Sequence, residues 1–267
     1  MSQSLFDGPA KSVQLKRALV RANRSESDDA LFLHREIAKE LADRLEVFSK
    51  KFRKIMIFRD VGFDWQSVAF LGTSDSLISV RCAPLSVESL SVDPESYDLI
   101  VAPLWLHWVD DLPRMLLALR LALKPGGVLI GAMFGGDSLI ELKRCLAEAE
   151  DRIYGGVHPR TSPAVELRTL AGLMQSAGFA LPVVDVDRIP LQYSSALKLM
   201  KDLSNAGESN AVSSRSRFVS GRRLIMEAAR LYHNHYATGE DNLIPVTCDV
   251  LHFSGSAPLK EDQSEAE

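Results

Sequence analysis

A strand, helix, strand, helix pattern across residues 97–146 constrains the fold more than any other feature of this sequence. Residues 99–102 are an apolar run of the length expected for a strand that is buried on both faces. A helix is expected from Pro113 to residue 123, because proline suits a first helical turn and the following KPGG ends a helix. Residues 128–134 form the next apolar strand, so the two strands can lie parallel in one sheet. The pattern predicts half of a doubly wound α/β sheet.

Ligands of such sheets bind beyond the carboxyl ends of the strands, which here are residues 105–108 and 135–137. After the second of these turns, Ser138 and Glu141 stand at the spacing of a capping box. We therefore expect these two side chains to cap a helix that runs to about residue 152.

Composition excludes several classes of protein. With 267 residues, 46% of them hydrophobic, the chain can form a single α/β domain with an insertion. The net charge of −4 gives no reason to expect nucleic acid or an anionic membrane as a partner. No apolar run approaches the ~20 residues of a membrane span. The three cysteines are far apart and odd in number, which favours a reducing compartment over a disulfide framework or a zinc site.

The remaining elements follow from hydrophobic periodicity. Residues 1–26 are a basic arm, either a mobile solvated face or a clamp over a ligand or partner. Strands are expected at residues 54–58, 77–82, 183–189 and 247–253. Helices are expected at residues 28–48, 165–178, 194–203 and 222–236.

The first of these strands is followed by RDVGFD, residues 59–64, where a nucleotide-binding α/β protein would carry a glycine-rich turn. Only Gly62 is a glycine there. The second strand is followed by Cys82 and Ala83, where a nucleoside site would place an acidic residue. Too few residues then remain before Tyr97 for a full strand and helix, so one βα unit is shortened or missing, with residues 87–92 as a candidate edge strand.

The polar segment 204–216 is either a flexible linker or a substrate loop, in which Glu208, Ser209 and Asn210 offer hydrogen-bonding groups. His233 and His235 are two residues apart, a spacing that separates them on a helix, so we expect no metal site there.

Taken in this order, the chain resembles the class I S-adenosylmethionine-dependent methyltransferases. Within them it is similar to the methyltransferase-like assembly factors of respiratory complex I and their bacterial counterparts, and more distantly to the malonyl-carrier-protein methyltransferase of biotin synthesis. The resemblance begins at Leu5-Phe6-Asp7. It is sharpest in LHWVDDLP (106–113), LKPGGVLIGAMFGGDSLIEL (123–142), GG-xx-P-xx-SP (155–163) and LMKDLSNAGESN (199–210).

This resemblance implies a Rossmann-like sheet of seven strands with a shortened N-terminal half, in which the last strand runs antiparallel. The expected domain spans residues 27–258, with a helical insertion at about 191–243 and an acidic tail at 259–267. It also implies a role in building complex I, by methylation or hydroxylation of an arginine on a hydrophilic subunit. Because the family pattern starts at residue 5, a bacterial cytoplasmic protein is expected rather than one with an organelle transit peptide.

Candidate site residues follow from the same resemblance and from the strand ends. The candidate cofactor contacts, for S-adenosylmethionine, are Asp60, Gly62, Leu104 and Trp105. The candidate substrate contacts are Trp108, Gly135, Gly136, Asp137, Glu208, Ser209 and Asn210. His107 is the candidate general base, although a histidine beyond a strand end is also often structural. For Trp105 and Trp108, stacking on a ligand and burial against the sheet are both open, and for the Gly135 turn helix capping is the alternative to substrate contact.

The chain departs from the family pattern at both principal cofactor contacts, the RDVGFD turn and Cys82 or Ala83. Two hypotheses therefore remain open: a transferase that modifies a protein side chain, and an assembly scaffold that keeps the fold without the cofactor. If the cofactor was lost, Phe63 or Trp65 is expected to fill the substituted turn. A nicotinamide oxidoreductase is disfavoured because the sequence has no G-x-G-x-x-G turn.

Overall fold

A computed structural model describes residues 4–22, 31–48, 51–58, 63–68, 76–80, 85–215 and 221–259. The chain divides into two compact units. Unit 1 comprises Met1–Leu33, Phe134–Val165 and Val186–Val250, and unit 2 comprises His34–Met133, Glu166–Asp185 and Leu251–Glu267. Each unit is described by itself.

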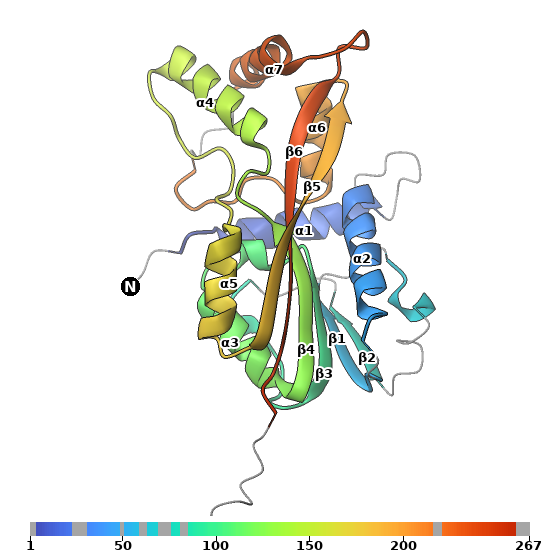
Figure 1. Ribbon diagram of the computed structural model, residues 1–267. Coiled ribbons are helices and arrows are strands. Elements are labelled where there is room, and N and C mark those ends of the chain that lie inside the picture. The colour runs from blue at the N-terminus through green and yellow to red at the C-terminus, as the bar shows by residue number, and fades with distance from the viewer. Residues whose placement is uncertain are drawn as a thin grey trace, which may run out of the picture. The chain divides into compact units, whose positions relative to one another are not determined.

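Unit 2 contains most of a sheet with the strand order β2-β1-β3-β4-β6-β5 (Figure 1), in which the end of β5 and the beginning of β6 belong to unit 1. The strands are β1 (Lys54–Phe58), β2 (Ser76–Val80), β3 (Tyr97–Pro103), β4 (Leu123–Phe134), β5 (Ala180–Tyr193) and β6 (Ile244–Ser256). The first four are parallel, with Ile57 paired to Val101 and Val101 paired to Ile130. The predicted doubly wound α/β sheet is confirmed.

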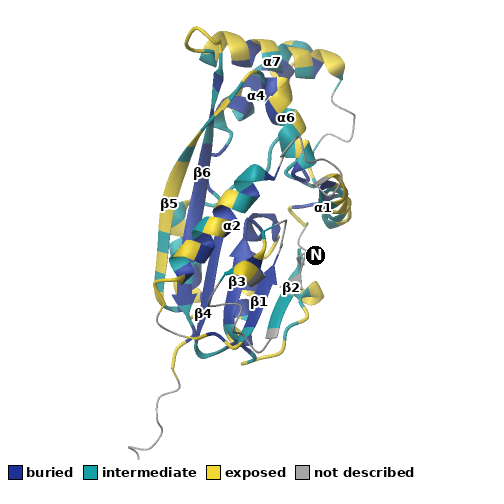
Figure 2. Cartoon of the chain, turned by 90° about the vertical axis from the view of Figure 1, so that its right-hand side faces the viewer, coloured by how far each residue is buried: buried dark blue, intermediate teal, exposed yellow. Residues whose placement is uncertain are grey.

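The central strands are buried and the outer strand β5 is not (Figure 2). In β3 the residues Leu99, Ile100 and Val101 are fully buried, as expected for an apolar run in a parallel sheet. Along β5, Leu181 and Val183 are exposed, as expected for an edge strand. The core of unit 2 therefore lies on β1, β3 and β4.

Helices cover both faces of this sheet (Figures 1 and 2). α3 (Leu112–Ala122) and α5 (Leu167–Ser176) lie on one face and α2 (Phe32–Leu45) on the other. The side chain of Asp111 caps α3 by accepting a hydrogen bond from the Arg114 N–H at 3.1 Å, at the place where the sequence predicts the helix to begin.

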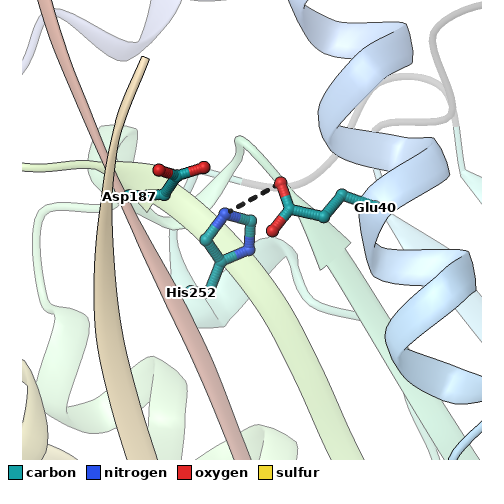
Figure 3. Close-up of side chains that lie close together, drawn as sticks. All are labelled: Glu40, Asp187 and His252. Carbon is teal, nitrogen blue, oxygen red and sulfur yellow. Dashed lines mark ion pairs between the residues drawn. The ribbon is translucent and has the colours of Figure 1, made fainter.

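A chain of polar contacts links α2 to the strands that it covers. Glu40 Oε2 lies 3.4 Å from Nε2 of the buried His252 on β6 (Figure 3). Glu40 also binds Arg44 at 2.8 Å, and Arg44 binds Asp185 on β5 at 2.9 Å. The polar side of α2 is thereby matched to polar positions of the sheet.

The last strand is antiparallel to its neighbour, as the resemblance implies. The Gly126 N–H near the start of β4 donates to Ala257 O at 3.0 Å, whereas the Gly135 N–H beyond its end donates to Asp249 O at 2.7 Å. Residue numbers therefore rise along β4 as they fall along β6.

Two expectations about the N-terminal half of the sheet are corrected. Among the described residues there are six strands rather than seven. Residues 87–92 do not form an edge strand, because Val87–Ser89 is a 3₁₀ turn in which the Ser89 hydroxyl donates to Ser86 O at 2.8 Å. Such local side-chain bonds compete with a sheet ladder. Between residues 85 and 96 the structure describes this 3₁₀ turn and no strand, which agrees with a βα unit that is shortened or missing.

Unit 1 contains α1 (Gly8–Ala22), α4 (Ile140–Tyr154), α6 (Ala196–Asn205) and α7 (Arg222–Tyr236). α4 packs on α7, and α6 packs on both α1 and α7. Their core consists of Leu142, Cys145, Leu146, Ala149, Ala196, Leu199, Leu224, Ala228, Leu231, Tyr232, Ile244 and Val246. No helix in the described ranges is long and apolar enough to cross a membrane.

Candidate functional site

The carboxyl ends of β1 and β3 in unit 2 are closed by an aromatic pair. Phe58 is the last residue of β1, and Trp105 follows β3. Their rings are stacked with centroids 4.3 Å apart and planes inclined by 28°, and both side chains are buried. Of the two alternatives for Trp105, this arrangement is burial against the sheet. Its role as a cofactor contact stays a prediction.

The backbone at Leu104 makes the turn that places these rings. Leu104 has a left-handed φ of 46°, and its N–H donates to Ala132 O on β4 at 2.8 Å. A non-glycine residue rarely adopts this conformation, so the surrounding contacts must hold it there. The turn leads into a 3₁₀ helix at Leu106–Trp108 that carries His107.

His107 and Trp108 lie together in that short helix, with ring centroids 5.4 Å apart. Both are buried, with 8% of His107 exposed. A general base must reach the proton that it removes. In this conformation His107 offers little surface to a substrate, so its catalytic role stays a prediction.

The two principal cofactor positions, Asp60 with Gly62 and Cys82 with Ala83, lie outside the described residues. The next described residues along the chain include an aromatic pair. Trp65 is buried, and the ring of Phe63 meets it edge to face with the ring centroids 4.8 Å apart. The Phe63–Trp65 and Phe58–Trp105 pairs are the aromatic contacts that the structure describes after β1 and β3. Whether S-adenosylmethionine binds at this edge of the sheet stays a prediction.

The turn after β4, in unit 1, joins the start of α4 to β6. The Ser138 hydroxyl donates to Asp249 O at 2.8 Å and accepts from the Asp249 N–H at 3.1 Å. Glu141 accepts hydrogen bonds from the N–H and the hydroxyl of Thr247. The predicted capping box is therefore wrong. Both side chains bind the neighbouring strand, and α4 begins after Leu139, whose φ is 60°.

Asp137 in this turn belongs to an ion-pair group that the sequence did not reveal. Arg188 donates to both carboxylate oxygens of Asp249, at 2.6 and 2.8 Å, and to Asp137 at 3.1 Å. The Asp249 side chain is only 8% exposed, and its carboxylate raises the pKa of Arg188 well above its ordinary value. An aspartate inside an otherwise apolar strand was the signal that could have pointed to this group.

The two glycines of the turn, Gly135 and Gly136, contribute through their backbone. The Gly135 N–H binds Asp249 O, as described above, and Gly136 O accepts a hydrogen bond from Lys143 Nζ at 3.3 Å. Any substrate that contacted Asp137 would have to share it with Arg188.

The three candidate residues of segment 204–215 also lie in unit 1, and two of them are already paired. The Glu208 carboxylate lies 3.9 Å from Lys11 Nζ on α1. Asn210 donates to Pro159 O at 2.8 Å and accepts from the Val212 N–H at 2.9 Å. Segment 204–215 is thus held by other parts of the chain and is not a free linker.

Pro159 belongs to the motif GG-xx-P-xx-SP, whose residues His158 and Arg160 bind a buried carboxylate on α4. Glu150 on α4 is 1% exposed and accepts hydrogen bonds from Arg160 and from the His158 N–H. These bonds, the Arg160 contact foremost, lower the pKa of Glu150 to about 2. Nothing in the motif GG-xx-P-xx-SP indicates which acid its arginine binds.

Comparison with known proteins agrees with this fold. Residues 28–182, more than half of the chain, match the family described as "Methyltransferase domain". A human protein named "Arginine-hydroxylase NDUFAF5, mitochondrial" is 32% identical over 269 residues, covering 94% of this chain and 76% of that protein. The protein of the same name from Dictyostelium discoideum is 36% identical over 172 residues, covering 64% of this chain and 39% of that protein. The chain thus spans less than half the length of some of the relatives it matches.

More distantly related proteins also agree with this fold. A "Malonyl-[acyl-carrier protein] O-methyltransferase" from Xylella fastidiosa is 27% identical over 281 residues, covering 96% of this chain and 90% of that protein. The crystal structure of a putative methyltransferase from Bacillus halodurans superposes with a TM-score of 0.52 at 11% identity, covering 83% of this chain and 98% of that one, which supports the fold alone. This chain therefore belongs to the methyltransferase-domain family, and proteins named arginine-hydroxylase NDUFAF5 are among its relatives.

Proposed function

We propose that this chain acts in the assembly of respiratory complex I by modifying an arginine side chain on a hydrophilic subunit, in a bacterial cytoplasm. The observation that carries the proposal is the relationship to the human arginine-hydroxylase over 94% of this chain. Because that coverage includes residues of both compact units, the likeness is not confined to the sheet. Hydroxylation is the activity in the relatives' name, and methylation from S-adenosylmethionine is the activity for which the fold family is named.

A second candidate function is an assembly scaffold that keeps the fold and the partner surface but no longer binds S-adenosylmethionine. The specific observation in its favour is the burial of aromatic rings after β1 and β3, above all the stack of Trp105 on Phe58. The loss of one hydrogen bond to a ligand costs ~1–3 kcal/mol, so two lost contacts would weaken binding ~100-fold or more.

Deletion of the gene in its native host, followed by mass spectrometry of the hydrophilic complex I subunits, tests the first proposal. The expected result is an arginine that gains one methyl group or one oxygen atom only when the gene is present. His107→Gln, compared with the exposed His235→Gln as a matched control, then shows whether His107 takes part. A host in which complex I assembles normally and unmodified, with and without the gene, would contradict both candidate functions.

Calorimetric titration of the purified protein with S-adenosylmethionine separates the two candidates. Binding together with a modified arginine supports the enzyme. No heat and no thermal shift at millimolar ligand, combined with loss of complex I in the deletion strain and an unmodified subunit, supports the scaffold.

A further inference from the structure

Segment 204–215 cannot order itself, because its sequence SNAGESNAVSSR is small and polar and offers few apolar side chains to a core. Besides the hydrogen bond from Asn210 to Pro159 O, residues 4–7, far away in the sequence, hold this segment in place. The Asp7 N–H donates to Ala211 O at 2.7 Å, and the Ser213 N–H donates to Leu5 O at 2.8 Å. Between these bonds, Phe6 and Val212 pair as an antiparallel bridge, and each is only 4% exposed.

One helical turn further along the chain, α1 places the ammonium group of Lys11 against segment 204–215. Lys11 is fully buried; its Nζ donates to Gly207 O and lies 3.9 Å from the Glu208 carboxylate, whose side chain is 5% exposed. A buried ammonium group is tolerated only when it is paired and hydrogen-bonded. The position of Lys11 and the conformation of residues 207–208 therefore depend on each other.

The backbone at Gly207 permits this close approach. Gly207 has a φ of 76°, and a Cβ at this position would lie 3.2 Å from Ala18 Cβ and 3.3 Å from Leu15 Cδ2 on α1. A residue other than glycine would be strained and would also push the helix away.

Further hydrogen bonds hold residues 7–14 and segment 204–215 together. Arg215 donates to one Asp7 carboxylate oxygen at 2.8 Å, while the other accepts from the Ala10 N–H at 3.0 Å and so caps α1. Gln14 donates to Asn210 O at 3.3 Å. The described residues of the N-terminal arm, 4–22, are therefore not only a solvated face: their contacts with segment 204–215 extend from Leu5 to α1.

We propose that residues 4–22 are a strap that keeps segment 204–215 in its binding conformation, and that Lys11 is the positioning residue that sets the Glu208 carboxylate. The claim that this segment contacts the protein partner rests on the proposed function. The strap itself does not, because its contacts lie within the chain.

Hydrogen exchange of the full-length chain, followed by mass spectrometry, tests the strap without any partner. Lys11→Met keeps the length of the side chain and removes the charge. Lys16→Met, on the exposed side of the same helix, is the matched control. We expect Lys11→Met to speed hydrogen exchange in residues 207–213 by about tenfold or more, while exchange in α7 stays at the wild-type rate. In the Lys16→Met protein, exchange should stay at the wild-type rate in both segments.

Unchanged exchange in residues 207–213 of the Lys11→Met protein would contradict the proposal that residues 4–22 hold segment 204–215 in place. If that protein does not fold, Arg215→Gln decides, because it removes only the peripheral bond to Asp7: faster exchange in residues 211–215 supports the strap, and an unchanged rate overturns it.

A double variant tests the positioning role. If Lys11 acts through Glu208, the protein with both Lys11→Met and Glu208→Gln exchanges no faster than the Lys11→Met protein, because the second change removes the carboxylate that was left unpaired; additive effects would contradict that role. In the host, the proposed function predicts less modified arginine with Lys11→Met than with Lys16→Met. Equal modification despite faster exchange would leave the strap standing and separate it from partner binding.

Discussion

Trp105 lies on the ring of Phe58, and this contact links the ends of two neighbouring parallel strands, β1 and β3. In a doubly wound sheet this edge normally receives the ligand. Here two core side chains, Phe58 and Trp105, are stacked and buried at this edge.

We expect Trp105→Ala to lower the free energy of unfolding by ~3–5 kcal/mol, because it removes a fully buried indole from the core. Trp105→Phe, which keeps an aromatic contact with Phe58, should cost less. Urea unfolding followed by circular dichroism measures both. If Trp105→Ala unfolds at the same urea concentration as the wild type, the ring does not support the sheet, and the cofactor alternative for Trp105 gains weight.

Gly131 on β4 has no room for a side chain. A Cβ there would overlap the ring of Phe253 on β6 and lie 2.8 Å from Ala102 O. Gly131→Ala should therefore destabilise the protein by ~1–3 kcal/mol. Gly172→Ala is the matched control, because Gly172 lies inside α5 with open space around it, and alanine there should stabilise by ~0.5–1 kcal/mol. Thermal unfolding of the two variants should shift in opposite directions, and a shared direction would contradict the packing at Gly131.

Glu150 should make the free energy of unfolding depend on pH. Arg160 and His158 lower its pKa from the ordinary 4.5 to about 2 in the folded chain. The folded state therefore binds this proton less readily than the unfolded state. The stabilisation is fully present above the ordinary pKa and is lost as the pH falls through about 2. Glu150→Gln should be less stable near neutral pH and should lose less stability on acidification. Urea midpoints measured from neutral to acid pH test this, with the exposed Glu240→Gln as control; parallel curves for Glu150→Gln and wild type would refute it.

Cys145 and Cys248 should resist alkylation in the native protein. Burial raises the pKa of Cys145 to about 11 and that of Cys248 to about 12, and the thiolate is the reactive form. At mildly alkaline pH, native labelling by iodoacetamide should be ~100-fold slower than labelling in urea. Peptide mass spectrometry measures each site separately. Fast native labelling of either cysteine would show that its surroundings open far more often than its burial indicates.

Local patterns predicted most of the elements. β1 and α7 have the bounds expected from their periodicity, Lys54–Phe58 and Arg222–Tyr236, because each carries its own apolar pattern. Gly178 has the left-handed φ, 82°, expected after α5. In these cases the signal lies within a few residues of the structure it determines.

The candidate site was less predictable, because its contacts join distant segments. Ser138 and Glu141 have capping-box spacing, yet β6 provides them with other partners. Arg188 and Asp249 are 61 residues apart, and Lys11 and Gly207 are 196 apart. A single sequence does not reveal such pairs, because nothing in the local pattern of either residue specifies the other.

The start of α4 has a consequence for how the chain folds during synthesis. Its first turn is secured by Asp249 and Thr247, which follow Ser138 and Glu141 by 111 and 106 residues. A nascent chain that ends soon after α4 has none of these bonds, so the helix would begin with an uncapped turn and remain frayed. Contacts of such long sequence separation form slowly. Unit 1 is therefore expected to mature late on the ribosome, once β6 has emerged.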